Sequence, residues 1–374
     1  MDIESRGKVE RNLGLEWLRL FSMFMIILLH SIDHSGLYET LKEGTGTLLY
    51  TYEQYIYALV QVGVNCFVLI SGYFLVRSKF KLRKLISLWI EVIFYSLVIK
   101  LIMMVVGEIP FSIVSLASCF VPILTGRYWF VTIYFGMYLL FPFYNIAIKA
   151  MNEQQHKRLV ILLLVLFPGM SSIYPSFKGM NSGGAWGLAW FTVLYFIAAY
   201  FRLYYVPDKR KKGSFAVFFA IPIIMTFALV VVQKMQIDAL INMVKNWWRY
   251  DSITVVIASI ALFRAFINMG NKALNRRGNQ LVVKISSTTF GVYLIHAHAN
   301  VCTEVMWQRL GMVNNMSYWW FPVYQLAIVG VSFLVCSLID YCRQRLFVAM
   351  KVDSVLTKIE MKVKRKLMYE DFGY

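Results

Sequence analysis

The chain has 374 residues, 59% of them hydrophobic, and a mean hydropathy of +0.59. Soluble domains are about 45–50% apolar, so this composition argues against a soluble globular protein. The formal net charge is +18, but no polar segment is long enough to form a soluble basic domain, which argues against nucleic-acid binding.

The apolar residues form continuous runs of roughly twenty, the length at which a helix crosses about 30 Å of hydrocarbon. Because these runs do not alternate with polar residues, helices are favoured over a barrel. We therefore predict an all-α integral membrane protein with about ten transmembrane helices. The predicted spans are about 13–32, 56–76, 85–106, 126–147, 159–175, 186–206, 214–233, 251–269, 285–305 and 319–341. Pro168-Gly169 interrupts the fifth span, which we expect to be kinked or re-entrant.

Positive charge alternates between successive predicted loops. With a cytoplasmic N-terminus, both ends and the even-numbered loops hold most of the 38 Lys and Arg residues. Cytoplasmic loops carry such an excess, so we predict that both termini are cytoplasmic. Residues 1–342 would form the transmembrane domain. Residues 343–374 would form a basic tail whose segment 352–367 is an amphipathic helix on the inner leaflet, or alternatively is disordered.

Cysteine offers no chemistry of its own. The five cysteines are scattered and mostly lie inside apolar runs, without CxxC or zinc-type spacing. We therefore predict neither a disulfide framework nor a metal site. The first apolar run is too long for a signal-peptide core and should remain as a membrane helix.

The first span carries a narrow polar stripe. Arg19 and His30 are eleven residues apart, close to three helical turns, and therefore point the same way. Glu16, Asp33 and His34 lie within about 60° of that direction. Ionisable groups at membrane depth usually face a bundle interior or a water-filled cavity. Alternatively, Arg19 snorkels to the inner headgroups, and His30 is an ordinary buried or interfacial histidine.

Several segments then resemble one family. Glu16-x-x-Arg19, followed after ten residues by His30, resembles the first-helix signature of the acyltransferase 3 family of membrane acyltransferases. Four further segments are similar to family segments in the same order, although Tyr73 stands where phenylalanine is usual and the arginine spacing after the second span is not cleanly reproduced. They are residues 66–75 with Ser71-Gly72, Lys81-Leu-Arg83-Lys84, Tyr128-Trp129-Phe130 and residues 287–296. The resemblance covers roughly residues 11–342.

The resemblance implies an activity and a location. The family uses acyl-CoA on the cytoplasmic side and modifies extracytoplasmic acceptors, often sugar hydroxyls of surface polysaccharides. It implies a multi-pass protein of a plasma membrane, of bacterial origin, with acetyl-CoA as the donor. Its partners would be membrane lipids, the acyl-CoA and a surface glycan or lipid-linked sugar, with no permanently bound cofactor. Arg19 and His30 match its implicated functional residues.

The residues suggest roles within that reaction. A sugar hydroxyl needs a base to take its proton, and imidazole titrates nearest neutral pH, so His30 is the candidate base or acyl carrier. Asp33 could orient it, and Arg19 could contact the donor or hold Glu16. The predicted donor contacts are Ser71, Arg77, Lys81, Arg83 and Lys84.

Polar and aromatic residues nearer the outside form the predicted acceptor site or pocket wall. They are Gln61, Asn65, Arg127, Trp129, Tyr293, His296 and Asn300. Ordinary roles compete with these assignments: positive-inside charge for the basic residues, and helix packing or interhelical hydrogen bonding for the polar ones. A different function, a glycan transporter, flippase or polymerase, also fits about ten spans. Sugar movement without any CoA requirement would favour it.

Overall fold

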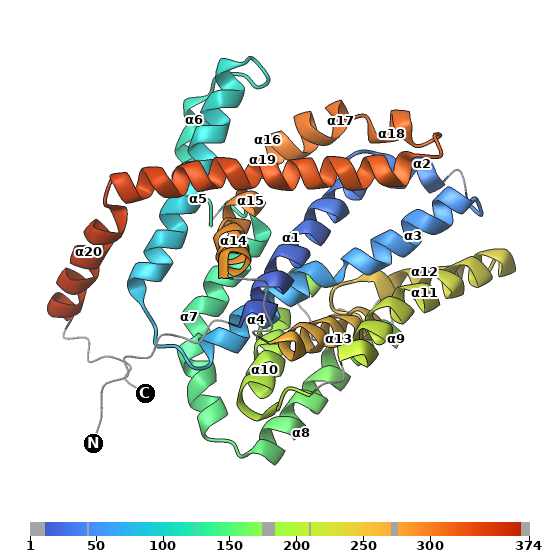
Figure 1. Cartoon of the computed structure of the whole chain (residues 1–374), viewed down its shortest axis with the longest axis horizontal. Coiled ribbons are helices and arrows are strands. Elements are labelled where there is room, and N and C mark those ends of the chain that lie inside the picture. Colours follow the sequence, from blue (N-terminus) through green and yellow to red (C-terminus); the bar gives the residue numbers. More distant parts are fainter. Residues whose placement is uncertain are drawn as a thin grey trace.

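The computed structural model describes residues 12–42, 45–123, 125–173, 184–208, 211–270 and 276–367. These residues form helices and no strands (Figure 1). The long helices of the first half are α1 (Leu13–Asp33), α3 (Leu48–Val60), α4 (Val62–Leu75), α5 (Leu82–Val105), α7 (Trp129–Lys149), α8 (Glu153–Leu164) and α10 (Leu188–Tyr204). Those of the second half are α11 (Lys211–Met235), α12 (Asp238–Lys245), α13 (Ile253–Met269), α14 (Arg276–Ser286), α15 (Thr289–His296), α19 (Phe321–Ala349) and α20 (Val352–Leu367).

Eight helical segments are long and apolar enough to cross a membrane. They are Leu13–Asp33, Leu48–Leu75, Leu82–Val105, Trp129–Lys149, Glu153–Ile173, Lys212–Met235, Asp238–Met269 and Phe321–Ala349. The shorter apolar helix α10 matches a ninth predicted span. The all-α membrane fold is therefore confirmed, whereas the count of about ten and the cytoplasmic termini stay predictions.

Three segments depart from regular helix near the predicted spans. The second span begins earlier than predicted, at Leu48, and passes from α3 to α4 at Gln61. The fifth contains the predicted irregularity as a π-helical turn, Val165–Gly169, before the short helix α9 (Met170–Ile173). Proline cannot donate the backbone hydrogen bond that a regular turn requires, so Pro168 accounts for this interruption.

The predicted span 285–305 is not one helix. It is divided into the end of α14, α15, α16 (Ala299–Val301) and a π-helical turn, Cys302–Met306. Around the first break, Thr288 Oγ1 donates to the carbonyl of Ile285 and Thr289 Oγ1 donates to that of Ser286. Hydroxyl groups that bond to nearby carbonyls compete with the regular helix, which apolar content alone does not reveal.

The last long apolar helix continues into the segment predicted to form the basic tail, while the predicted domain division itself stays a prediction. α19 continues through residue 342 to Ala349, because Arg343 forms ion pairs with Asp340 and Glu91 (each 2.6 Å) and is satisfied inside the bundle. α20 follows as a helix over the predicted amphipathic segment. It packs against α5 as well as α19 (Figure 1).

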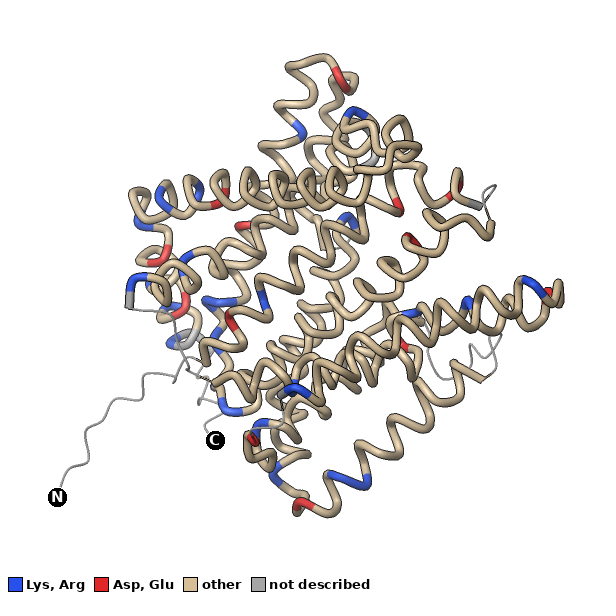
Figure 2. The backbone as a smooth tube through the Cα atoms, turned by 45° about the vertical axis from the view of Figure 1, so that its right-hand side comes forward, with Lys and Arg blue, Asp and Glu red and all other residues tan. Residues whose placement is uncertain are grey.

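Two features position the site. α4 lies in the middle of the molecule and packs against α1, α10 and α13 (Figure 1). Lysine and arginine gather where the helices end on one side, shown at the left and lower edge of Figure 2. We call this the basic side; Arg77, Lys79, Lys84 and Lys149 line two neighbouring cavities there.

Candidate active site

The beginning of α1 is fixed against the neighbouring helix α13. The Asn12 side chain caps α1 by accepting from the amide of Leu15 at 3.2 Å. The amide of Gly14 donates to the carbonyl of Gly270 at 3.1 Å, and a Cβ on Gly14 would lie 2.0 Å from the carbonyl oxygen of Phe266. Only glycine fits this approach, so the helix that carries the polar stripe has a defined position and rotation.

At the basic side, α1 borders a cavity of about 460 Å³, which we call the basic cavity. Arg19 donates to Glu16 Oε2 at 2.7 Å, and the Ser286 hydroxyl donates to the same oxygen at 2.5 Å. Glu16 therefore anchors the guanidinium to α1 and to the end of α14. The lining residues are Glu16, Arg19, Ser71, Phe74, Leu75, Ser78, Lys84, Leu85, Leu88, Tyr134 and Tyr138.

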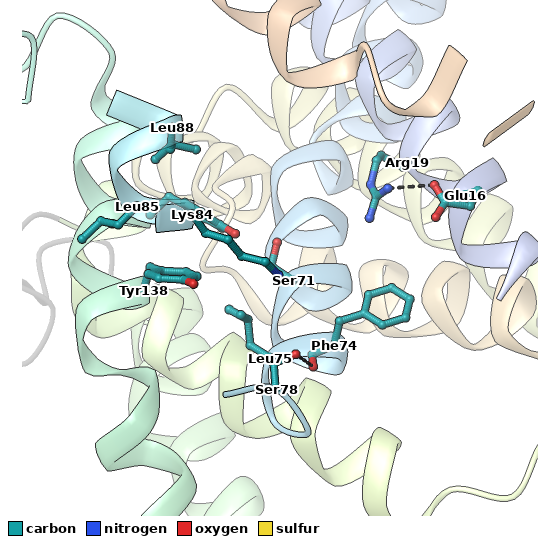
Figure 3. Close-up of a pocket in the computed structure, with 11 residues that line it drawn as sticks. Glu16, Arg19, Ser71, Phe74, Leu75, Ser78, Lys84, Leu85, Leu88 and Tyr138 are labelled. Carbon is teal, nitrogen blue, oxygen red and sulfur yellow. Dashed lines mark hydrogen bonds and ion pairs between the residues drawn. The ribbon is translucent and has the colours of Figure 1, made fainter. Parts of the chain in front are cut away.

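The basic cavity contains four of the predicted residues. Arg19 and Lys84 project into it from opposite walls in Figure 3, with Glu16 behind Arg19 and Ser71 between the two walls. The Ser71 hydroxyl also donates to the carbonyl of Phe67 at 2.9 Å. Two cations and a hydroxyl beside apolar walls form an environment suited to an anionic group attached to a slender, partly apolar chain.

The other predicted donor contacts lie around the basic cavity. Arg77 lines a separate cavity of about 400 Å³ with Lys79 and Lys149. Arg83 donates to Asp353 at 3.0 Å and to Thr357 at 3.1 Å, both on α20. The exposed Lys81 precedes α5, and its carbonyl accepts from Tyr138 at 3.3 Å.

Further along α1, His30 lines a small cavity of about 40 Å³, which we call the middle cavity. Trp129 and Tyr293, two predicted pocket-wall residues, lie there as well, and the full lining is Met23, Ile26, His30, Val64, Phe67, Trp129, Phe130, Tyr250, Phe290 and Tyr293. The imidazole of His30 lies beside two others, with ring centroids 5.1 Å from His296 and 5.3 Å from His34. His296 is fully buried.

The contact between α15 and α19 positions α15, the helix that carries His296. A Cβ on Gly291 would lie 1.9 Å from Asp340 Oδ1, so only glycine allows the two helices this approach. Asp340 is buried and accepts hydrogen bonds from Tyr95 and Arg343. This network, which holds α5, α15 and α19 together, was not predicted from the sequence.

At the far end of α1 lies a cavity of about 260 Å³, which we call the outer cavity. Asp33 faces it and accepts a hydrogen bond from Tyr57, while the predicted Gln61 lines another part. No hydrogen bond joins Asp33 to His30 in the part of the chain that the structure describes, so Asp33 does not orient the imidazole in this conformation. The lining is Asp33, Tyr38, Gln54, Tyr57, Gln61, Ala185, Trp186, Lys245, Trp248, Arg249 and Tyr250.

Four of the seven residues predicted for the acceptor site lie outside the linings of these three cavities: His296, whose ring lies beside that of His30, and Asn65, Arg127 and Asn300. Asn65 is buried and joins helices: it donates to Tyr250 O at 2.8 Å and accepts from Trp190 at 3.1 Å. Arg127 donates to the Ser118 hydroxyl at 2.8 Å. Asn300 lies in the short helix α16.

Aromatic side chains stand at both junctions between the cavities. Phe130 of the middle cavity stacks on Tyr134 of the basic cavity, with centroids 6.0 Å apart and planes at 17°. Tyr250 lines both the middle and the outer cavity, and Trp129 stacks on it at 6.3 Å and 14°. The three cavities are therefore arranged in series along α1, with stacked rings between them.

Sequence reasoning missed most of the outer cavity. Tyr57, Trp186 and the adjacent pair Arg249-Tyr250 come from three separate segments, and Arg249 holds the buried Asp251 through two 3.0 Å hydrogen bonds. Trp248 belongs to a tryptophan pair that an interfacial position would also explain. The only available signal was that this pair directly precedes Arg249 and Tyr250. Among the described residues, no group of His, Cys, Asp or Glu could hold a metal ion.

The chain was also compared with known proteins. The family model described as an acyltransferase domain, that of acyltransferase 3, matches residues 12–341. No curated protein and no solved structure matches the chain. The family match covers α1 through most of α19 and therefore includes all three cavities. The chain belongs to the acyltransferase 3 family and is a membrane acyltransferase.

Proposed function

We propose that this protein is an O-acyltransferase that moves an acetyl group from acetyl-CoA at the cytoplasmic face to a hydroxyl of a surface polysaccharide or glycolipid outside. The basic side would face the cytoplasm, and the membrane would be a bacterial plasma membrane. One observation supports this proposal above others: a single helix brings Arg19, His30 and Asp33 to three successive cavities. Each cavity has a composition that suits one stage of the transfer.

The basic cavity suits the donor. CoA carries phosphate groups, which arginine and lysine bind through charge-assisted hydrogen bonds. Arg19 and Lys84 supply two such cations, and the apolar walls fit the narrow pantetheine arm. From Arg19 to His30 is about 16 Å along the helix at 1.5 Å per residue, a distance that an extended pantetheine arm can span.

The outer cavity suits a sugar. Five aromatic side chains offer faces on which a sugar ring can stack, and Gln54 and Gln61 offer amide groups for its hydroxyls. Binding sites of this kind combine apolar faces with a few polar groups that fix orientation. Asp33, at the same cavity, could accept a hydrogen bond from a sugar hydroxyl and so helps to position the acceptor.

His30 would connect the two substrates. As general base it takes the proton of the sugar hydroxyl while that oxygen bonds to the thioester carbonyl carbon. The carbon–sulfur bond then breaks, and the departing CoA thiolate takes the proton from the imidazolium. In the two-step alternative, an imidazole nitrogen of His30 bonds to the acetyl carbon as the carbon–sulfur bond breaks and the CoA thiolate leaves. The sugar oxygen then bonds to that carbon, the bond to the imidazole breaks, and the freed nitrogen takes the hydroxyl proton and passes it to the thiolate.

The closed middle cavity requires movement during this reaction. At about 40 Å³ it is small, and ring stacks stand on both sides of His30. Displacement of Phe130 and Tyr134 would admit the thioester, and displacement of Tyr250 would admit the sugar hydroxyl. Such gating limits access of water to the thioester, and thus its hydrolysis.

Replacing His30 by Ala tests the proposal. Loss of a general base typically costs 10²–10⁴-fold, so we expect transfer from labelled acetyl-CoA to envelope glycan to fall by at least about 100-fold. Unchanged thermal unfolding in detergent would show that the fold is retained. The matched control is His34→Ala, which removes a neighbouring imidazole from the end of the same helix.

Two results would contradict the proposal. Normal transfer by the His30→Ala protein would remove the proposed base. Movement of a sugar or glycan across the membrane by the purified protein, with no requirement for acetyl-CoA, would instead favour the transporter, flippase or polymerase alternative.

A further inference from the structure

The tautomer of His296 is defined by its surroundings. Its Nδ1 lies 2.6 Å from the carbonyl oxygen of Val292, one turn earlier in α15. A carbonyl oxygen only accepts hydrogen bonds, so Nδ1 must carry the proton. In neutral His296 the other nitrogen, Nε2, therefore has a free lone pair and acts as an acceptor.

Two nitrogens in adjacent rings lack partners. His296 Nε2 is buried and has no hydrogen bond, and the same is true of His30 Nδ1. The two ring centroids are 5.1 Å apart. Buried polar groups are nearly always paired, so each such nitrogen calls for an explanation.

We propose that His296 orients His30. In this arrangement His30 carries its proton on Nδ1, and this N–H donates a hydrogen bond to His296 Nε2. The two nitrogens do not bond to each other in the present conformation. Hydrogen bonds of catalytic groups are often long or poorly aligned without substrate and tighten in the complex. This inference rests on the proposed function and assigns to His296 the orienting role that the sequence suggested for Asp33.

Exposure to the middle cavity indicates which of the two imidazoles acts as the base. His30 lines the middle cavity and is partly exposed, whereas His296 is fully buried and is not part of that lining. A reacting hydroxyl would therefore meet His30 first. The other titratable groups near His30 are His34 on the same helix, Tyr293 on α15 and Tyr250 across the cavity.

The arrangement has a chemical consequence. With the proton on Nδ1, Nε2 of His30 has the lone pair that faces the reactants. During transfer Nε2 gains the hydroxyl proton and later returns it to the departing thiolate, while the Nδ1 proton stays in place. The resulting imidazolium donates a stronger hydrogen bond to His296 Nε2 than the neutral ring does, which stabilises the charge that develops on His30.

Two amide substitutions at residue 296 test this role. In His296→Gln the longer side chain places an amide oxygen near the former Nε2, whereas in His296→Asn the shorter one reaches only the former Nδ1 position. We expect His296→Asn to lose on the order of 10- to 100-fold in kcat, by comparison with the loss of a hydrogen-bond partner that orients a metal-ligating histidine. The Gln variant should recover most of that loss. Equal activity of the two variants would overturn the proposal.

The pH profile distinguishes orientation from simple packing. Losing the acceptor makes His30 less basic, so in His296→Asn the rise of kcat with pH should shift to lower pH, and the plateau should fall. His296→Gln should keep the wild-type position. His156→Gln, which replaces a buried histidine of α8 that lines none of the three cavities, should leave both features unchanged. A fall in the plateau with no shift in the Asn variant would contradict the orienting role.

A measurement without turnover keeps this inference separate from the proposed function. Nitrogen-15 NMR of histidine-labelled protein in detergent should show His30 with its proton on Nδ1 in the wild type. It should show reversion to the usual Nε2 form in His296→Leu. A wild-type His30 protonated on Nε2 would overturn the inference even if acetyl transfer is normal. The Nδ1 form with no transfer from acetyl-CoA would support the inference and refute the function.

Discussion

The basic cavity and the outer cavity lie at opposite ends of one helix and differ in how they present polarity. The basic cavity has two cations, Arg19 and Lys84, and a single carboxylate, Glu16, that already holds one of them. The outer cavity also has charged side chains, Asp33, Lys245 and an Arg249 held by Asp251, but it adds five aromatic side chains and two amides. Cations beside apolar walls at one end, and ring faces with amides at the other, imply that donor and acceptor are recognised by different forces.

The largest expected effect that separates the two ends comes from Arg19→Ala. A hydrogen bond to a charged group contributes about 1.5–3 kcal/mol, so kcat/KM for acetyl-CoA should fall roughly 10- to 100-fold. The KM for the acceptor should stay the same. Initial rates at varied donor and acceptor concentrations measure both quantities.

Ser286→Ala is the control for that substitution. It removes one hydrogen bond to Glu16 and leaves the guanidinium in place, so its effect on the donor should be much smaller. If Arg19→Ala raised the KM of the acceptor and left the donor unaffected, the assignment of the basic cavity to CoA would be wrong.

An intermediate effect, confined to the other end, is expected from Trp186→Ala. An aromatic contact contributes about 0.5–1.5 kcal/mol, so the KM for the glycan should rise about 2- to 10-fold, with kcat/KM for acetyl-CoA unchanged. Trp319→Ala removes a tryptophan that is 91% exposed and lines none of the three cavities, and should change neither. If Trp186→Ala and Trp319→Ala changed the KM for the glycan equally, Trp186 would not contact the sugar.

The smallest effect should come from Lys84→Gln. Exposed charge pairs contribute about 0.2–1 kcal/mol, so the KM for acetyl-CoA should rise only about 1.5- to 5-fold. Because salt screens exposed charges, the difference from wild type should shrink as ionic strength increases. Lys157→Gln, at an exposed lysine of α8 that lines none of the three cavities, should have no effect. A salt-independent change at Lys84 would indicate packing and not charge.

The part of the site that could be predicted is the part that depends on local geometry. The interval between Arg19 and His30 fixes their common direction because a helix turns about 100° per residue. The irregularity at Pro168 is likewise local. In contrast, Tyr57 and Tyr250 both line the outer cavity because distant segments pack together, and the sequence distance between them does not predict this proximity.

The same distinction explains two features of the fold that were not predicted from the sequence. Residues 285–305 are apolar enough for a span, but the hydroxyls of Thr288 and Thr289 turn back onto the chain where α14 ends and α15 begins. Arg343 was assigned to the tail as one of many positive charges. Its partner Glu91 is on α5, 252 positions away, so the ion pair that keeps it within the bundle was invisible to a reading of charge alone.

The arrangement of α1 constrains how its gene can vary. Deleting or inserting one codon between Arg19 and His30 would rotate the two side chains relative to each other by about 100° about the helix axis. One of them would then point away from its cavity, into a neighbouring helix or into lipid. The glycine at position 14 anchors the start of the helix, so a rotation of the whole element could not absorb the change. Conservative apolar replacements between the two residues leave this common direction intact, so they should be tolerated far better than length changes, except at Met23 and Ile26, which line the middle cavity.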